Sequence, residues 1–308
     1  NGVSYGYVTD ALQDLKLEDK VRVLRIGFSH PMPGNLIKKF LKECKKILVV
    51  EEGEPYMEES VKAFAQEEGL TLPIMGKGDD LFSRLYEYDP ALVRKCIAKY
   101  FEADYSAPQA LALSNVPELP PRPPTLCPGC SHRAAFYAVK KAASELGMET
   151  ICPTDIGCYT LGFLAPLSMG DFLICMGSSV GTACGFSRVN DKKVISFIGD
   201  STFFHSGIPG LINAVFNNHN FTLVILDNGI TAMTGHQPNP GVDMSHFKLT
   251  GYGRLVIEDI VKALGVPHIT VIKPYKIKKS MEAIKDALNF KGVSVIIAQE
   301  MCTLYAKG

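Results

Sequence analysis

The chain has 308 residues, of which 46% are hydrophobic, so it is long enough for two domains with buried cores. Its 32 basic and 32 acidic residues cancel to a formal net charge of zero, which argues against nucleic acid and anionic membranes as partners. No apolar run approaches the roughly 20 residues that span a bilayer, and residues 1–4 lack the pattern of a signal peptide. We therefore expect a globular, cytoplasmic α/β protein.

The first part of the chain, residues 1–103, alternates short apolar runs with amphipathic stretches. Residues 21–26 and 47–50 have the composition of strands, and the apolar side chains within 36–41 and 61–65 recur at helical spacing. This alternation predicts a small parallel-sheet domain. The acidic pairs 51–52 and 58–59 are interpreted as solvated faces or helix-end charges.

Residues 104–125 contain six prolines, which prevent a regular helix and disfavour a central strand. We interpret this segment as an interdomain linker, and its proline-rich end predicts a stiff, partly polyproline-like chain.

Residues 126–308 form the second predicted domain, in which helical and strand patterns again alternate. This order predicts a doubly wound parallel sheet, with ligands bound at the carboxyl ends of its strands. The expected helices cover 131–146, a stretch after 206, 258–264 and 279–288, and the expected strands cover 193–198, 221–226, 268–272 and 293–298.

Two polar residues follow consecutive strands of this predicted sheet. Asp200 and Asn228 are 28 positions apart, an interval that holds one crossover helix and one further strand. Both side chains should therefore emerge at the same edge of adjacent parallel strands. A carboxylate, an amide oxygen and the backbone carbonyl of Ile230 suit Mg²⁺, and Gly199 would let a diphosphate approach the backbone.

This arrangement resembles the thiamine diphosphate fingerprint, G-D-G followed after 25 to 30 residues by N. Ser201 stands where the family has its second glycine, and Ser201 and Thr202 are expected to face the phosphates. Taken alone, Gly-Asp-Ser would equally fit a strand-to-helix turn with Asp200 as the helix cap. The downstream Met233 and Thr234 resemble the M-T-G-x-Q segment of 2-oxoacid:ferredoxin oxidoreductases and predict a wall of the cofactor site. Gly177 and Ser178 suit a further loop around the cofactor or, alternatively, close helix packing.

Four of the nine cysteines lie beside glycine, proline or chain-turning segments. Cys127 and Cys130 form a C-x-x-C pair before a predicted helix, Cys158 follows a glycine, and Cys302 follows the last strand. Four thiolates from three loops at one sheet edge can hold zinc or a [4Fe–4S] cluster, and the spacing alone does not choose between them. The alternative is a redox-inactive C-x-x-C with two unrelated buried cysteines.

These motifs together resemble the large subunit of the indolepyruvate ferredoxin oxidoreductase family, in which C-x-G-C, a later I-G-C and a cysteine after the last strand bind the proximal [4Fe–4S] cluster. The likeness spans nearly the whole chain, and residues 1–103 resemble the transketolase C-terminal-like domain of that subunit. It implies thiamine diphosphate and Mg²⁺ as cofactors. It also implies oxidative decarboxylation of an aryl 2-oxo acid such as indolepyruvate, with acyl transfer to coenzyme A and electron transfer to ferredoxin.

The resemblance further implies partners. The glutamate that activates the cofactor is expected on a pyrimidine-binding domain or subunit, and a small beta subunit and an oligomeric assembly are expected as well. The first residue is Asn1, which leaves open a fragment, a processed product or a separate subunit. Two other functions stay open: a subunit of a non-oxidative thiamine diphosphate-dependent decarboxylase, and a non-catalytic cofactor-binding scaffold.

Overall fold

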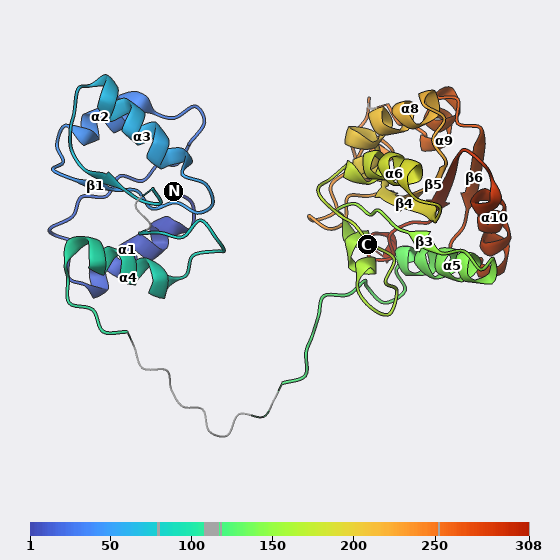
Figure 1. Ribbon diagram of the computed structural model, residues 1–308, viewed down its shortest axis with the longest axis horizontal. Coiled ribbons are helices and arrows are strands. Elements are labelled where there is room, and N and C mark those ends of the chain that lie inside the picture. Colours follow the sequence, from blue (N-terminus) through green and yellow to red (C-terminus); the bar gives the residue numbers. More distant parts are fainter. Residues whose placement is uncertain (79–80, 108–116, 118, 252, 308) are drawn as a thin grey trace. The chain divides into compact units, whose positions relative to one another are not determined.

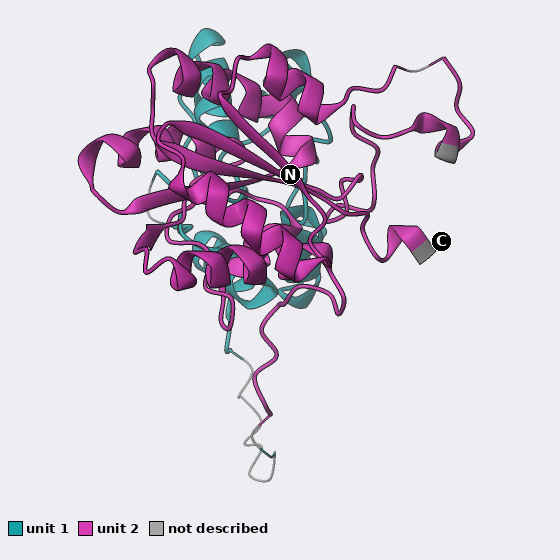
Figure 2. Ribbon diagram, turned by 90° about the vertical axis from the view of Figure 1, so that its right-hand side faces the viewer, with its two compact units in different colours: residues 1–118 teal, residues 119–308 magenta. Residues whose placement is uncertain are grey.

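A computed structural model describes residues 1–78, 81–107, 117, 119–251 and 253–307. The chain divides into two compact units, residues 1–118 and 119–308 (Figure 2). Much of the predicted linker over 104–125 lies outside the described residues, so its polyproline character stays a prediction.

Unit 1 is built on a short parallel sheet between two pairs of helices (Figure 1). Its side chains alternate: Ile47 and Val49 pack into one cluster with α2 and α3, whereas Leu48 and Val50 pack against α1 and α4. A two-stranded sheet buries its faces through such helices, because the pair alone exposes too much backbone. The elements are α1 (Ser4–Asp14), α2 (Gly34–Leu41), β1 (Ile47–Leu48), α3 (Tyr56–Glu67), β2 (Ile74–Met75) and α4 (Pro90–Phe101).

The strand predicted over residues 21–26 is wrong, because this segment forms no ladder with another strand. Its apolar side chains are nevertheless used: Leu24 and Ile26 pack into the cluster with α2 and α3, and Val21 packs on the α1–α4 side. Alternating apolar residues indicate which side chains are buried. A β-ladder also requires a neighbouring strand with free backbone N–H and C=O groups.

The acidic pairs were expected to be solvated faces or helix-end charges, and the first alternative is wrong for Glu51 and Glu58, which are buried. Glu51 is buried, and its carboxylate accepts the N–H groups of Met57 (2.8 Å) and Glu58 (2.9 Å), at the first turn of α3. Glu58 is only 1% exposed and accepts hydrogen bonds from Lys62 Nζ (2.6 Å) and the backbone N–H of Lys77 (2.5 Å). Glu51 is thus a helix-end charge, and Glu58 ties α3 to the turn after β2.

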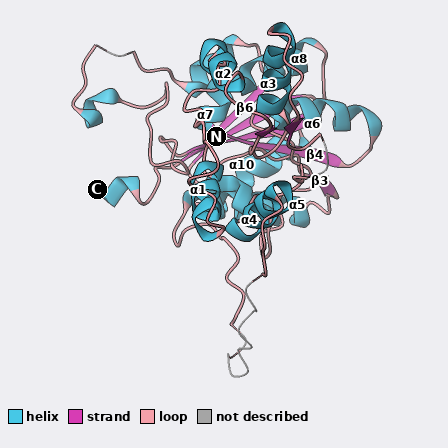
Figure 3. Cartoon of the chain, turned by 90° about the vertical axis from the view of Figure 1, so that its left-hand side faces the viewer, coloured by secondary structure: helices cyan, strands magenta, loops and turns pink. Residues whose placement is uncertain are grey.

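Unit 2 is a five-stranded parallel sheet in the order β3-β4-β5-β7-β6 (Figures 1 and 3). All four strand pairings are parallel, and helices connect the strands and cover both faces, as the doubly wound prediction requires. Its strands are β3 (Thr150–Ile151), β4 (Lys193–Gly199), β5 (Phe221–Asp227), β6 (His268–Ile272) and β7 (Val293–Gln299); its helices are α5 (Ser131–Glu145), α6 (Ser178–Val189), α7 (Asp200–Thr202), α8 (Ile208–Phe216), α9 (Ile257–Ala263) and α10 (Ile277–Asn289), with short turns η1 (Cys158–Phe163), η2 (Phe203–Gly207), η3 (Met244–Phe247) and η4 (Tyr305–Lys307).

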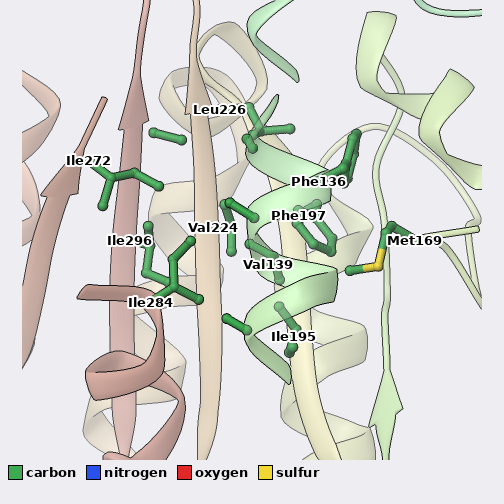
Figure 4. Packing of buried hydrophobic residues seen from close by; sticks show 14 of the residues in the cluster. Phe136, Val139, Met169, Ile195, Phe197, Val224, Leu226, Ile272, Ile284 and Ile296 are labelled. Carbon is green, nitrogen blue, oxygen red and sulfur yellow. The ribbon is translucent and has the colours of Figure 1, made fainter. Parts of the chain in front are cut away.

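Two cores lie on the two faces of this sheet. Along β5, Val224 and Leu226 face α5 and α10, whereas Leu223 and Ile225 face α6, α8 and α9. Figure 4 shows the first of these cores, where Phe197 and Phe136 pack with ring centroids 4.8 Å apart. Burial on both faces explains why these strands are nearly continuous apolar runs.

The sequence patterns missed β3 and α6. Helix α6 is rich in small residues, such as Gly181, Thr182 and Gly185, and small side chains weaken the periodic apolar signal. Among the described helices, none is long and apolar enough to cross a membrane.

Candidate functional site

Asp200 and the turn after β5 meet at the carboxyl ends of neighbouring strands. Gly199, the last residue of β4, pairs with Leu226, and so Asp200 comes to lie beside the end of β5. The Asp200 side chain is 4% exposed. Its Oδ2 accepts the backbone N–H of Gly229 at 3.0 Å, and its Oδ1 accepts the N–H of Ser201 at 2.7 Å. The two halves of the motif are therefore joined directly.

A second carboxylate lies at this point. Burial and the neighbouring charge of Asp227 raise the pKa of Asp200 to about 7, against the opposing effect of the Ser201 and Gly229 N–H groups and of the nearby Asn239 amide. The Gly229 N–H is shared, because it also lies 3.2 Å from Asp227 Oδ1. A divalent cation would relieve the repulsion between these carboxylates and favour their ionised forms. Asp227 directly precedes Asn228, yet it was not among the predicted site residues.

Asn228 and Ile230 are both buried in the turn after β5. The Asn228 amide oxygen accepts the N–H of Ile230 at a long 3.3 Å, and its backbone carbonyl accepts the N–H of Cys302 at 3.0 Å. One short region thus contains the Asp200 carboxylate, the Asn228 amide oxygen and the Ile230 carbonyl. Such oxygen ligands suit Mg²⁺, which usually keeps further positions for phosphate and water.

Gly199 has a different neighbour from the one expected. A Cβ atom at this position would lie 2.5 Å from Cε1 of Tyr159, so the absent side chain makes room for an aromatic ring. The Tyr159 hydroxyl donates to the Ile156 carbonyl at 3.0 Å and lies 3.5 Å from Thr202 Oγ1. Tyr159 follows Cys158 directly, so this buried ring links the cysteine loop to the Gly199–Thr202 turn.

Gly177 and Ser178 begin α6 and are held by an aspartate that the sequence analysis did not select. Asp155 is fully buried, and its carboxylate accepts the Gly177 N–H at 2.8 and 2.9 Å and the Ser179 N–H at 3.3 Å. Gly177 has a φ of 88° and packs on Ser206, where a Cβ would come within 2.3 Å of the serine Cβ. The start of α6 therefore lies against η2, the turn that follows Thr202. The Ser178 hydroxyl donates to the Cys175 carbonyl at 2.7 Å.

Met233 and Thr234 lie in a closed loop at the surface. Thr231 and Gln237 pair across its base, with N···O distances of 2.9 and 3.2 Å. The Thr234 hydroxyl donates to Gln237 Oε1 at 2.6 Å, whereas Met233 is 47% exposed. The loop is thus internally braced and leaves an apolar side chain accessible.

The four cysteines predicted to act together influence one another electrostatically. Burial and, to a smaller extent, the neighbouring Cys130, Cys302 and Cys127 together raise the pKa of Cys158 to about 11. Burial is also the main cause of the raised pKa of Cys130, to which Cys127 and Cys302 add. Thiols that disfavour one another's ionisation are the ones that a bound cation would deprotonate.

Within the described ranges, no three His, Cys, Asp or Glu side chains come close enough together to hold one metal ion. Among the oxygen ligands that suit Mg²⁺ here, only Asp200 is an acidic side chain. The other two are the Asn228 amide oxygen and the Ile230 carbonyl. A [4Fe–4S] cluster holds each thiolate on a different iron, so its cysteines lie further apart than the ligands of one zinc ion.

The fold and these loops together define a cofactor domain of the thiamine diphosphate type. Residues 155–298 match the family described as thiamine pyrophosphate enzyme, C-terminal TPP binding domain. The match includes Asp155, Asp200 and Asn228 and runs to the end of β7. Residues 155–298 thus form a domain of this family.

Over nearly its whole length, the chain is similar to the indolepyruvate oxidoreductase subunit IorA. It is 47% identical to that subunit from Methanothermobacter thermautotrophicus, over 99% of this chain and 48% of the relative. The subunit from Thermococcus kodakarensis is 42% identical over 100% of this chain and 49% of its own length. The chain therefore spans about half the length of the curated relatives it matches.

A solved structure has the same fold over part of the chain. The 2-oxoglutarate:ferredoxin oxidoreductase from Magnetococcus marinus, with 2-oxoglutarate, coenzyme A and succinyl-CoA bound, aligns with a TM-score of 0.53 at 23% identity. The alignment covers 59% of this chain and 65% of that one. This likeness confirms the α/β fold class.

Proposed function

We propose that this chain supplies the diphosphate- and metal-binding half of a thiamine diphosphate-dependent oxidoreductase that oxidatively decarboxylates aryl 2-oxo acids of the indolepyruvate kind. The single observation that carries the proposal is the contact between Asp200 Oδ2 and the Gly229 N–H at 3.0 Å, which joins the two halves of the fingerprint. The homology to indolepyruvate oxidoreductase subunits supports the oxidative reaction and the substrate class.

In this proposal Asp200, the Asn228 amide oxygen and the Ile230 carbonyl hold Mg²⁺, and the metal holds the diphosphate. The backbone at Gly199, Ser201 and Thr202 borders the phosphates, and Gly177 and Ser178 border them from the start of α6. Met233 and Thr234 form a wall of the cofactor pocket. Bound thiamine diphosphate supplies the electron sink that decarboxylation of a 2-oxo acid needs. The chain's own part is to position the cofactor and to shield it from water.

We propose a [4Fe–4S] cluster as the group that Cys127, Cys130, Cys158 and Cys302 hold. The pKa values of Cys130 and Cys158 are raised in part by the other thiols of this set, which supports a shared ligand. The Cys302 N–H donates to the Asn228 carbonyl at 3.0 Å. One of the four cysteines is therefore in direct contact with a proposed metal ligand. A cluster at this place would lie close enough to the cofactor to accept electrons one at a time.

The remaining parts of the reaction are assigned to partners. We propose that the activating glutamate lies on a pyrimidine-binding domain or subunit, outside the part of the relatives that this chain matches, which is 48% of one of them. A small beta subunit, ferredoxin as electron acceptor, coenzyme A as acyl acceptor, and a cytoplasmic oligomer complete the proposal. Relatives named 2-oxoacid:ferredoxin oxidoreductase subunit beta, such as one from Sulfolobus that is 27% identical, support a multi-subunit assembly.

Isothermal titration calorimetry tests the metal and cofactor site. Thiamine diphosphate should bind in the presence of Mg²⁺ and not in the presence of a chelator, and Asp200→Asn should weaken binding more than about 100-fold, because a neutral amide replaces the charged metal ligand. The matched control is Asp191→Asn, an exposed aspartate just before the opposite end of β4. Equal binding by Asp200→Asn and wild type would refute the proposed site.

Iron analysis tests the cysteine assignment separately. Protein purified without oxygen should contain about four iron atoms per chain, with broad visible absorption that Cys158→Ser removes. Cys184→Ser, a change at a buried cysteine in α6, should leave the iron content unchanged. Iron-free protein that still binds thiamine diphosphate would point instead to a non-oxidative decarboxylase.

A further inference from the structure

One buried amide near Asp200 has a hydrogen-bond donor without a partner. Asn239 lies between Pro238 and Pro240 and is 8% exposed. Its Oδ1 accepts the Gly241 N–H at 2.9 Å, which fixes the orientation of the amide. Its Nδ2 is buried and has no acceptor among the described residues. A buried donor in this condition costs free energy, so the position calls for an explanation.

The loop that carries Asn239 packs on the turn that follows Asp200. A Cβ at Gly241 would lie 3.0 Å from the ring of Phe204, in η2, and 3.3 Å from Asn239 Oδ1. The outer side of the loop is held by Arg254, whose Nε donates to the Gly241 carbonyl at 3.0 Å. The loop that carries Asn239 is therefore braced against η2, which begins three residues after Asp200.

The neighbouring carboxylates already have other donors. Asp200 accepts the N–H groups of Ser201 and Gly229, and the side chain of Asp227 accepts the Gly229 N–H and Gln299 Nε2, the latter at 3.2 Å. The amide of Asn239 lies near enough to Asp200 to lower its pKa, yet it does not reach hydrogen-bond geometry with it. Its N–H groups thus face the metal site while they lack an acceptor there.

We propose that Asn239 is a diphosphate-binding residue, whose Nδ2 donates to a phosphate oxygen of the metal-bound cofactor. This inference rests on the proposed function, because the metal at Asp200 brings that oxygen into reach. Phosphate oxygens are strong acceptors, and a hydrogen bond to a charged group is stronger than one between neutral groups. Binding would then satisfy a donor that the described residues leave unpaired beside the proposed metal site.

Two substitutions separate this role from a structural one. Asn239→Asp keeps the shape and the oxygen that accepts from Gly241, but it replaces the donor by a carboxylate. Asn239→Ser removes the donor, while its hydroxyl can still hold the turn. The control is Asn190→Asp, because the Asn190 Oδ1 accepts the Lys192 N–H at 2.8 Å in the same kind of turn, at the other end of β4.

The experiment is calorimetric titration of the full chain with thiamine diphosphate and with inorganic pyrophosphate, both in saturating Mg²⁺. We expect Asn239→Ser to weaken both ligands about 10-fold and Asn239→Asp about 100-fold, because the carboxylate adds repulsion to the lost hydrogen bond. A purely structural residue would give the opposite order, since aspartate is the closer replacement in shape. The melting temperature without ligand reports any loss of folding.

The outcomes are distinct. Unchanged affinity of both Asn239 variants, or a larger loss in Asn239→Ser than in Asn239→Asp, overturns the role of Asn239 and leaves the proposed function standing. Wild-type protein that binds neither ligand overturns the proposed function itself. Weaker binding in the expected order, with Asn190→Asp at wild-type affinity, supports the inference.

Discussion

At the scale of single residues, the glycine of the fingerprint serves the packing of a neighbouring ring. A side chain on Gly199 would meet Tyr159, which is buried and also packs against Gly157. The motif G-D-S therefore depends on a tyrosine 40 residues earlier in the chain. Pattern reading attributed the glycine to close approach of the diphosphate. The structure adds a steric reason that operates before any ligand binds.

This packing predicts the effect of adding one methyl group. Gly199→Ala should lower the free energy of unfolding by about 1–3 kcal/mol, because the new Cβ overlaps a ring that has little room to move. Gly181→Ala is the control, since nothing lies within 4 Å of a Cβ there. Urea denaturation of both variants measures the difference. The steric account fails if Gly199→Ala is as stable as the control, or if adding Tyr159→Ala does not reduce the cost of Gly199→Ala.

At the scale of elements, unit 1 depends on a buried carboxylate. Glu58 in α3 accepts hydrogen bonds from Lys62 and from the backbone of Lys77 and Gly78, just after β2. Burial by itself would raise the pKa of Glu58, but these donors outweigh it and lower the pKa below its ordinary 4.5. The ionised form is thus the one that the folded state favours.

The sign of the pH dependence follows from the lowered pKa. Glu58 contributes stability above the pKa of the unfolded chain, and this contribution is lost as the pH falls through the lower folded value. At pH 7, Glu58→Gln should destabilise unit 1 by about 1.5–3 kcal/mol. The gap to wild type should shrink when the pH is lowered below about 4.5.

Thermal unfolding across this pH range measures the gap, with Glu59→Gln as the matched control. Glu59 is the next residue of the same helix turn and is exposed. A destabilisation by Glu58→Gln that is equal at pH 7 and pH 3.5 would contradict the role of the charge, and so would an equal effect of Glu59→Gln.

At the scale of the whole molecule, the two units have separate cores, and only unit 2 carries the proposed cofactor site. A ligand that binds one folded unit stabilises that unit by mass action. Thiamine diphosphate with Mg²⁺, at about 100 times its dissociation constant, should therefore add about 2.7 kcal/mol to the stability of unit 2. Unit 1 should be unaffected.

Scanning calorimetry measures this effect, and the chain has no tryptophan to serve as a fluorescent reporter. We expect two transitions, of which one moves upward with the ligand and one stays. The same titration with a chelator is the control and should move neither. A single transition that shifts as one body would show that the two units unfold together.

Much of the fold of unit 2 was predictable because its strands are buried on both faces. The predicted strand over 268–272 coincides with β6, and those over 193–198, 221–226 and 293–298 match β4, β5 and β7 to within a residue at their ends. The failures have local causes. Residues 21–26 alternate like a strand but form no ladder, and α6 was hidden by its small residues.

By itself, the sequence determined that two parallel strands end in an acid and an amide, because periodicity and turn residues are local properties of the chain. The family resemblance also came from the sequence, because the motifs that carry it have the spacing found in the family. Only the tertiary structure decided that Asp155 holds the start of α6, that Asp227 joins Asp200, and that Asn239 has an unpaired donor beside them. These relations join residues up to 39 positions apart, and no local pattern encodes a contact that arises only when separate loops meet at one sheet edge.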